Sequence, residues 1–292
     1  MKIRLVLLLC LIAGLSLSPW LGAQAPQPPA PPPPAARLTI LDDNTVARPG
    51  VKAVWGFACL AEAGGHTVLF DTGADPAVLK DNLAALKIDP SRIEAVVISH
   101  YHGDHTWGAP GLGNRPGVPV YTPRSFADHP KEAAALASAG LTLVPVCAMT
   151  PLFAGIAISE PLHFTDRIAT GKAGTGFHDD LCEECLTVDT PEGLVVIVGC
   201  SHPGILTLLD QVSKEHGRPI ALVIGGFHLL GDSRDHVRSI AASMKAMGVR
   251  GVSATHCTGG LAEAVFREEF GDSYVDAGVG AVITTPLAAK ER

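Results

Sequence analysis

The chain has 292 residues, 47% of them hydrophobic and 17% charged, and its formal net charge at pH 7 is −7. This composition is sufficient to fill a sizeable core, which excludes disorder throughout the chain. The acidic balance and the lack of any lysine or arginine cluster in the sequence argue against a nucleic-acid partner, because phosphate backbones are bound mainly by clustered basic side chains.

The first 25 residues have the pattern of a secretory signal peptide. A basic start over residues 1–4 precedes an apolar run over residues 5–17. The run is shorter than the ~20 residues that span a bilayer comfortably, so an uncleaved membrane anchor is the less favoured alternative. We therefore expect a secreted or periplasmic protein with no stable membrane insertion after signal cleavage.

Residues 26–37 form a spacer that is rich in proline and alanine. Such a composition favours an extended, semi-rigid chain and contributes nothing to a core. A single folded domain is expected over residues 38–292.

Within this domain, strands are predicted from apolar runs at 51–60, 67–70, 95–99, 141–146, 186–188, 194–198, 221–224 and 281–284. Helices are predicted at 76–86, 131–139, 204–216, 235–247 and 261–270. Asp75 and Pro76 supply a favoured cap and first position for the first helix. Strands mixed with helices in this order indicate an α/β fold with two packed sheets and helices outside.

A carboxylate, Asp71, follows the predicted strand at 67–70 and stands two residues before Gly73. At such a strand end a carboxylate can bind a metal ion or fix neighbouring backbone, and Asp-x-Gly is also a common turn sequence. The residues alone leave these roles open.

The most informative stretch is 96–108, where an apolar β-branched run leads into three histidines and an aspartate. His100 and His102 are two positions apart, so their rings point to the same side of an extended segment. Gly103 lets the backbone turn and brings Asp104 and His105 against them. Imidazole suits zinc, iron or nickel, and the carboxylate adds a ligand that manganese or iron also accepts. Two adjacent cation sites are predicted, with a surface turn that binds nothing as the alternative.

The pattern His100-x-His102-x-Asp104-His105 resembles the signature of the metallo-β-lactamase superfamily. The resemblance covers most of the chain after the N-terminal segment and implies a four-layer αββα sandwich. Similarity to the branch named for dihydropterin ribofuranosyl-aminobenzene phosphate synthases is carried by residues 199–205, 225–229 and 256–259. Membership of a branch says little about the substrate of any one member.

The same resemblance implies one further ligand for each metal ion. His202 is expected to join the first two histidines of the motif, and His256 to join Asp104 and His105. Asp71 would then hydrogen-bond the motif loop and hold the ligands in orientation without binding the metal.

Two other residues at strand ends have alternative roles. Cys200 is either a thiolate ligand of the second metal ion or a buried apolar thiol. His228, which follows two glycines, is either a substrate-side residue that transfers protons or a buried structural histidine.

Cys182 and Cys185 have the spacing of half a zinc knuckle, but the sequence has no second pair of the right spacing. A disulfide or two unrelated thiols is therefore expected there. Glu183 and Glu184 depart from the acidic residues and glutamine of the branch pattern, so no substrate contact is assigned to them.

The sequence thus predicts a hydrolase that uses two divalent metal ions, with zinc expected and iron or manganese as alternatives. A metal-bound hydroxide would attack an ester, phosphoester or lactam in a small-molecule substrate, and Asp104 would orient the nucleophile. The alternatives are the pterin-phosphate synthase activity of the branch, which export would separate from the cytoplasmic pterin pool, a mononuclear iron dioxygenase acting on thiols, and a metal-holding scaffold without turnover. The sequence gives no signal of oligomeric state.

Overall fold

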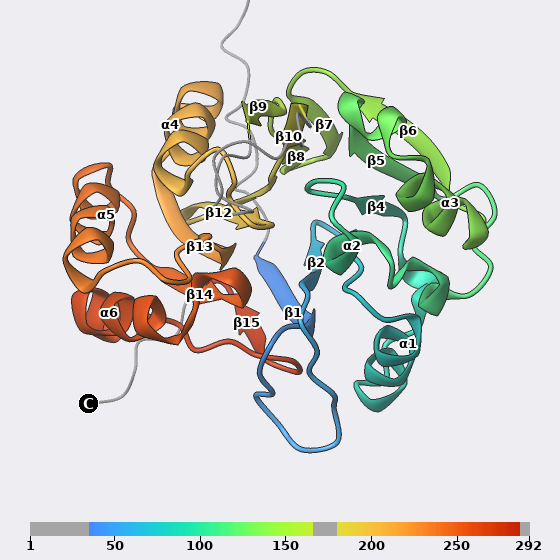
Figure 1. Ribbon diagram of the computed structural model, residues 1–292, viewed down its shortest axis with the longest axis horizontal. Helices are drawn as coiled ribbons and strands as arrows, with labels where there is room; N and C mark the ends of the chain where they lie inside the picture. Colours follow the sequence, from blue (N-terminus) through green and yellow to red (C-terminus); the bar gives the residue numbers. More distant parts are fainter. Residues whose placement is uncertain (1–34, 166–179, 287–292) are drawn as a thin grey trace, which may run out of the picture. The chain divides into compact units, whose positions relative to one another are not determined.

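The computed structural model describes residues 35–165 and 180–286 (Figure 1). The expected signal peptide and nearly all of the spacer lie outside the described residues. The first strand, β1 (Ala36–Asp42), begins two residues before the expected domain start. Over the described ranges, we find no helix with the length and apolar character needed to cross a bilayer.

The first large sheet of the described chain has the strand order β15-β1-β2-β3-β4-β5-β6. Strands β15, β1, β2 and β3 pair antiparallel, whereas β3, β4, β5 and β6 pair in parallel. Apart from β1, its strands are β2 (Ala58–Ala63), β3 (His66–Phe70), β4 (Ala95–Val97), β5 (Pro119–Pro123), β6 (Thr142–Val146) and β15 (Val282–Thr284). Its helices are α1 (Pro76–Ala85), α2 (Gly103–Thr106) and α3 (Pro130–Ser138).

The second large sheet has the order β14-β13-β12-β11-β8-β7 among the described residues, and β12, β13 and β14 run in parallel. Its strands are β7 (Thr150–Phe153), β8 (Ile156–Ile158), β11 (Leu186–Thr190), β12 (Gly193–Val198), β13 (Ile220–Gly226) and β14 (Val252–Thr255). Three helices follow its parallel strands: α4 (Ile205–His216), α5 (Arg234–Ala246) and α6 (Gly260–Phe270). A separate pair consists of β9 (Leu162–Thr165) and β10 (Asp180–Glu183).

The two sheets pack against each other, and the helices cover their outer faces (Figure 1). Strand β12 is buried along its whole length, and its side chains alternate between two clusters. Val195 and Ile197 share the inner core with Val97 of the first sheet, whereas Val196 and Val198 pack in the core beneath α4, α5 and α6. Burial on both faces explains why this strand is a continuous apolar run. The predicted four-layer αββα arrangement is confirmed.

The predicted strand over residues 51–60 is wrong in its first part, since β2 begins only at Ala58. The Asn82 side chain of α1 accepts a hydrogen bond from the Lys52 N–H at 2.8 Å and donates one to the Lys52 carbonyl oxygen at 2.8 Å. The backbone there therefore pairs with a side chain instead of a neighbouring strand, although its apolar residues resemble those of a strand.

Candidate metal centre

The motif residues follow β4, one of the parallel strands of the first sheet. After β4 the chain bends at Ser99 and His100 and then enters the one-turn helix α2, for which His102 is the N-terminal cap residue. The turn expected at Gly103 is thus the first residue of this helix, and the helix carries Asp104 and His105. His100 Nε2 lies 3.1 Å from His102 Nδ1, so these two rings come together as predicted.

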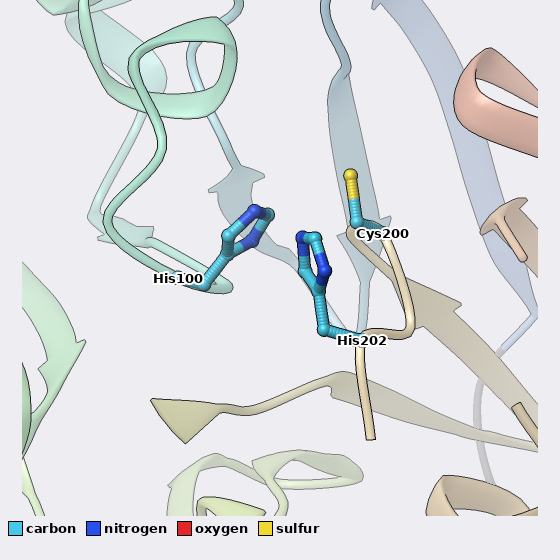
Figure 2. Close-up of side chains that lie close together, drawn as sticks. All are labelled: His100, Cys200 and His202. Atoms are coloured by element: carbon cyan, nitrogen blue, oxygen red, sulfur yellow. The ribbon is translucent and has the colours of Figure 1, made fainter. Parts of the chain in front are cut away.

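His202 approaches the same place from the loop after β12. Its ring centre lies 4.8 Å from that of His100 and 4.9 Å from that of His102. Figure 2 shows the His100 and His202 rings pointing toward one another from two different loops, with Cys200 beside His202. The three expected ligands of the first site therefore form one group.

The second group forms around Asp104. Its Oδ2 lies 3.4 Å from His256 Nε2 and 3.8 Å from His105 Nε2. The same oxygen accepts a hydrogen bond of 2.9 Å from the indole N–H of Trp55. His256 follows β14 and has a φ of 50°, and its N–H donates to Asp43 at 3.0 Å. Neither Trp55 nor Asp43 is predictable from the sequence, because neither has a ligand-like motif around it.

The sulfur of Cys200 lies between the two groups. It is 3.2 Å from His105 Nε2, and its distances to the donor atoms of His100 and His202 and to those of His105 and His256 are all within 4.8 Å. Cys200 is buried. The structure thus places this thiol among the donors of both groups. This position fits both roles expected for Cys200, a metal ligand and a buried apolar thiol.

His228 follows the carboxyl end of β13 and is near this cluster. Its ring centre is 4.4 Å from that of His202, and one of its ring nitrogens lies within 4.8 Å of the sulfurs of Cys200 and Cys257. His228 is only partly buried, in agreement with a place at the edge of the centre. Cys257 was not singled out in the sequence, although it stands directly after His256.

Asp71 lies behind the motif residues. It is fully buried and accepts hydrogen bonds from the N–H and the hydroxyl of Ser99 at 2.7 and 2.8 Å. Its Oδ2 is 2.7 Å from His105 Nδ1, and His100 Nδ1 is 2.8 Å from the Ser99 hydroxyl. Ser99 and Asp71 thus hold the Nδ1 atoms of His100 and His105, while the Nε2 atoms of these two rings face other possible metal ligands. This arrangement agrees with the orienting role expected of Asp71.

Glu183 holds the loop after β12 and was not predicted to do so. Its carboxylate accepts three backbone N–H hydrogen bonds, from Cys200, Ser201 and His202, at 2.9, 2.7 and 2.6 Å. Ser201 has a φ of 62°, so the loop is sharply bent at this point. Glu183 is fully buried, and burial raises the pKa of its carboxyl to about 7.

The electrostatics of the cluster favour neutral imidazoles at His100 and His202 and a charged imidazole at His105. Burial, together with the neighbouring histidines, lowers the pKa of His100 well below its usual value and that of His202 to about 2. For His105, burial acts in the opposite direction to the carboxylates of Asp71 and Asp104, which prevail and raise its pKa to about 9. Burial also opposes the charge of Asp104, but His105 and His256 lower its pKa below the usual range.

These donors fit a divalent transition metal. Neutral imidazole, which the lowered pKa values favour at His100 and His202, is the form of histidine that binds a metal ion. Five histidines, one carboxylate and one thiol are ligands that zinc and iron both accept. The ligands assigned to each site from the sequence are brought together within the described residues.

Within the described residues, Cys182 and Cys185 are not joined by a disulfide. Cys182 Sγ lies 3.1 Å from a ring nitrogen of His163, whereas Cys185 Sγ donates to the Ser159 hydroxyl at 3.2 Å. Of the two structures expected for this pair, the two unrelated thiols are found.

Comparison with known proteins agrees with this geometry. The family model described as "Metallo-beta-lactamase superfamily" matches residues 56–181. The crystal structure of Tm1679, named as a metal-dependent hydrolase of the beta-lactamase superfamily, is 28% identical, with a TM-score of 0.68 over 85% of this chain and 98% of that chain. The chain is thus similar to the metallo-β-lactamase superfamily in sequence over residues 56–181 and in fold. The superfamily and fold predicted from the sequence are therefore confirmed.

Two further proteins show how far the similarity extends. The 7,8-dihydropterin-6-methyl-4-(beta-D-ribofuranosyl)-aminobenzene-5'-phosphate synthase of Methanocaldococcus jannaschii is 29% identical over 245 residues, which cover 74% of this chain and 83% of the relative. The metallo-beta-lactamase fold protein YhfI from Bacillus subtilis is 15% identical, with a TM-score of 0.59 over 86% of this chain and 99% of that chain, and shows the fold alone.

Proposed function

We propose that this metallo-β-lactamase superfamily member is a metal-dependent hydrolase that binds two divalent metal ions, most readily zinc, and cleaves a small ester, phosphoester or lactam. The observation that carries the proposal is the convergence of two donor groups, one of three histidines and one of a carboxylate and two histidines, at the ends of strands from both sheets. The similarity to Tm1679, a metal-dependent hydrolase, supports the same reaction class.

The assignment of ligands follows the two groups. His100, His102 and His202 would hold one ion, and Asp104, His105 and His256 the other. Bound there, the ions would supply Lewis acidity, which lowers the pKa of water toward ~7 and polarises the bond under attack.

The chain's own residues would set orientation and proton transfer. The Trp55 indole N–H holds Oδ2 of Asp104, which fixes the rotation of that carboxylate. His228 stands beside His202 at the partly exposed edge, where an imidazole can give a proton to a leaving group. Glu183 and Asp71 keep the loops of His202 and His105 in place through their hydrogen bonds.

A second candidate is a reaction on a pterin phosphate. The observation that favours it is the 29% identity to the synthase of Methanocaldococcus jannaschii over 83% of that protein. The same donor groups would serve it. Export, which we also propose on the basis of residues 1–25, counts against this candidate because it separates the enzyme from cytoplasmic pterins.

Metal analysis combined with a substrate panel tests the proposal. We expect about two zinc ions per chain in protein purified without added metal, and hydrolysis of at least one of a carboxylic ester, a phosphodiester, a phosphomonoester and a β-lactam. His202→Ala should abolish that hydrolysis, whereas His236→Ala, on the exposed face of α5, serves as the matched control.

Other results of the same experiment would overturn the proposal. One iron per chain, no hydrolysis and oxygen consumption with a thiol would identify the mononuclear dioxygenase. Turnover of the dihydropterin phosphate substrate alone would identify the synthase activity. Hydrolysis that His202→Ala leaves intact would place the reaction outside this centre.

A further inference from the structure

Three side chains beside the two donor groups form a cluster of their own. The thiols of Cys200 and Cys257 and the His228 imidazole have donor atoms that all lie within 4.8 Å of one another. The cysteines are only 3% and 4% exposed. The six ligands proposed above include none of the three, so the cluster is an additional set of groups that could hold a metal ion.

The fold produces this cluster from three adjacent parallel strands. Cys200 follows β12, His228 follows β13, and Cys257 follows β14. Because the carboxyl ends of parallel strands meet at the same edge of a sheet, residues far apart in the sequence come together there. The His228 backbone, with a φ of 52°, turns sharply directly after the strand.

Close packing of the backbone holds the second thiol in place. A Cβ atom at Gly226 would lie 2.6 Å from Cys257 Sγ and 2.7 Å from the carbonyl oxygen of Gly199, so only glycine allows this approach. Cys257 Sγ also donates to the carbonyl oxygen of Cys200 at 3.6 Å. The position of the Cys257 sulfur is therefore set by the ends of both neighbouring strands.

Both cysteines are free thiols, and their sulfur atoms are spaced for a shared metal ion. The sulfur atoms of Cys200 and Cys257 lie within 4.8 Å of each other. Two bonds of ~2.3 Å to one zinc ion accommodate sulfurs that are about 4 Å apart.

We propose that Cys200, Cys257 and His228 form a sulfur-rich site for one thiophilic divalent cation, zinc or ferrous iron. Two thiolates and one imidazole are a known zinc ligand set, and it leaves a fourth position open. Since Cys200 Sγ is also 3.2 Å from His105 Nε2, this cation would share a sulfur ligand with the neighbouring site. When the site is loaded, His228 is a ligand and no longer a proton-transfer group.

Cobalt titration of the reduced, metal-free full-length protein tests the site. Cobalt bound by thiolate gives a sulfur-to-metal charge-transfer band, which histidine and carboxylate ligands do not give. We expect Cys257→Ser to lose about half of the band and one bound cobalt, and His228→Ala to weaken cobalt binding in the same titration step. The matched control is Cys147→Ser, because Cys147 is an exposed cysteine of the described chain.

The outcomes separate this site from the proposed hydrolase. If Cys257→Ser keeps the full band and the full cobalt count while Cys200→Ser loses both, Cys200 serves the neighbouring site alone and the proposal is overturned. If hydrolysis is never found but the band depends on both cysteines, the sulfur site stands and the proposed reaction fails. Circular dichroism of each variant confirms that the fold is retained before titration.

Discussion

Asp71 illustrates how a single buried side chain organises the centre. It contacts Ser99 and His105 through three hydrogen bonds and has a φ of 56°, which is uncommon for a residue other than glycine. The carboxylate therefore fixes both the strand end before His100 and the ring of His105. We expect its role to be the orientation of metal ligands without binding the metal itself.

This role predicts a specific effect of Asp71→Ala. The number of metal ions bound at saturation should stay the same, but affinity for the second ion should fall about 10-fold to 100-fold, as is usual when a partner behind a ligand is removed. Competition with a chromophoric chelator measures this. Asp81→Ala is the control, since Asp81 is an exposed residue that pairs with Lys52. Unchanged metal retention in Asp71→Ala would reduce Asp71 to a turn residue.

Glu184 is a second buried carboxyl group of the described chain. It is fully buried, and neither oxygen has a hydrogen-bond partner among residues 35–165 and 180–286. Burial, with smaller contributions from Asp71 and Cys147, raises its pKa well above the usual value. The folded protein therefore binds one proton more than the unfolded chain between the unfolded pKa of ~4.3 and the raised folded pKa.

Because the folded protein binds more protons than the unfolded chain in this range, its stability should depend on pH. Stability should fall as pH rises from ~4.3 toward the raised pKa, by about 1.4 kcal/mol per pH unit from this group. Glu184→Gln removes the group that titrates. The free energy of unfolding of this variant minus that of the parent protein should therefore increase with pH. Urea unfolding at pH 5, 6, 7 and 8 checks this against Glu160→Gln, an exposed control. A difference that is constant over these pH values would refute the assignment.

The motif histidines were predictable because their spacing is local, while several of their partners are distant in sequence. Trp55 lies 49 residues before Asp104, and Glu183 lies 19 residues before His202. No pattern of neighbouring residues marks either one. Cys257 was missed although it adjoins His256, because a buried cysteine without a pair at metal-ligand spacing is commonplace.

At the scale of elements, helices were easier to predict than short strands. The structure has a helix at each range predicted for one, with ends that differ by one residue, because the apolar period and the Asp75 cap are both visible in the sequence. Strand β5 was missed since it begins and ends with proline, a residue disfavoured in sheets. Strand β1 was missed as well, and its pairing with β15 joins residues more than 240 positions apart.

The end of β13 gives a test at this scale. A side chain at Gly226 would meet Cys257 Sγ and the Gly199 carbonyl oxygen, so Gly226→Ala should lower the free energy of unfolding by about 1 to 3 kcal/mol, as overpacking usually does. Gly260→Ala is the control, because a Cβ there meets nothing within 4 Å. Urea unfolding of both variants measures the difference. Equal midpoints would mean that β13 and β14 separate easily and that Cys257 is not held in place.

Residues 1–25 predict that the protein is exported. The basic start and apolar run predict a mature chain that begins between Gln24 and Ala36. Removal before the folded domain would leave the sheets intact, since the first strand begins at Ala36. N-terminal sequencing of protein from an exporting host measures the start. Soluble cytoplasmic protein that retains Met1 would remove the signal-peptide interpretation.

Each donor group takes residues from both halves of the molecule. The motif loop after β4 belongs to the first sheet, whereas His202 and His256 follow strands of the second sheet. A metal ion in either group would therefore connect the two packed sheets, and its binding energy would add to the stability of the folded chain. The two groups share no histidine or carboxylate, so each contribution can be removed separately.

This separation leads to a prediction for His202→Ala and His256→Ala. Each variant should retain about one of the two ions bound by these groups in the parent protein, and hydrolysis should fall strongly in both, because one cation serves the nucleophile and the other the developing charge. At a free zinc concentration 100 times the dissociation constant, one ion adds about 2.7 kcal/mol to the free energy of unfolding, and each variant should lose one such increment. Zinc analysis and urea unfolding, each with and without chelator, measure both quantities.

With chelator, the variants and the parent protein should differ little, which shows that the loss comes from the metal and not from packing. If His256→Ala retains both ions and full activity, Asp104 and His105 bind their metal with another partner, and His228, whose ring centre lies 4.4 Å from that of His202, is the residue to substitute next.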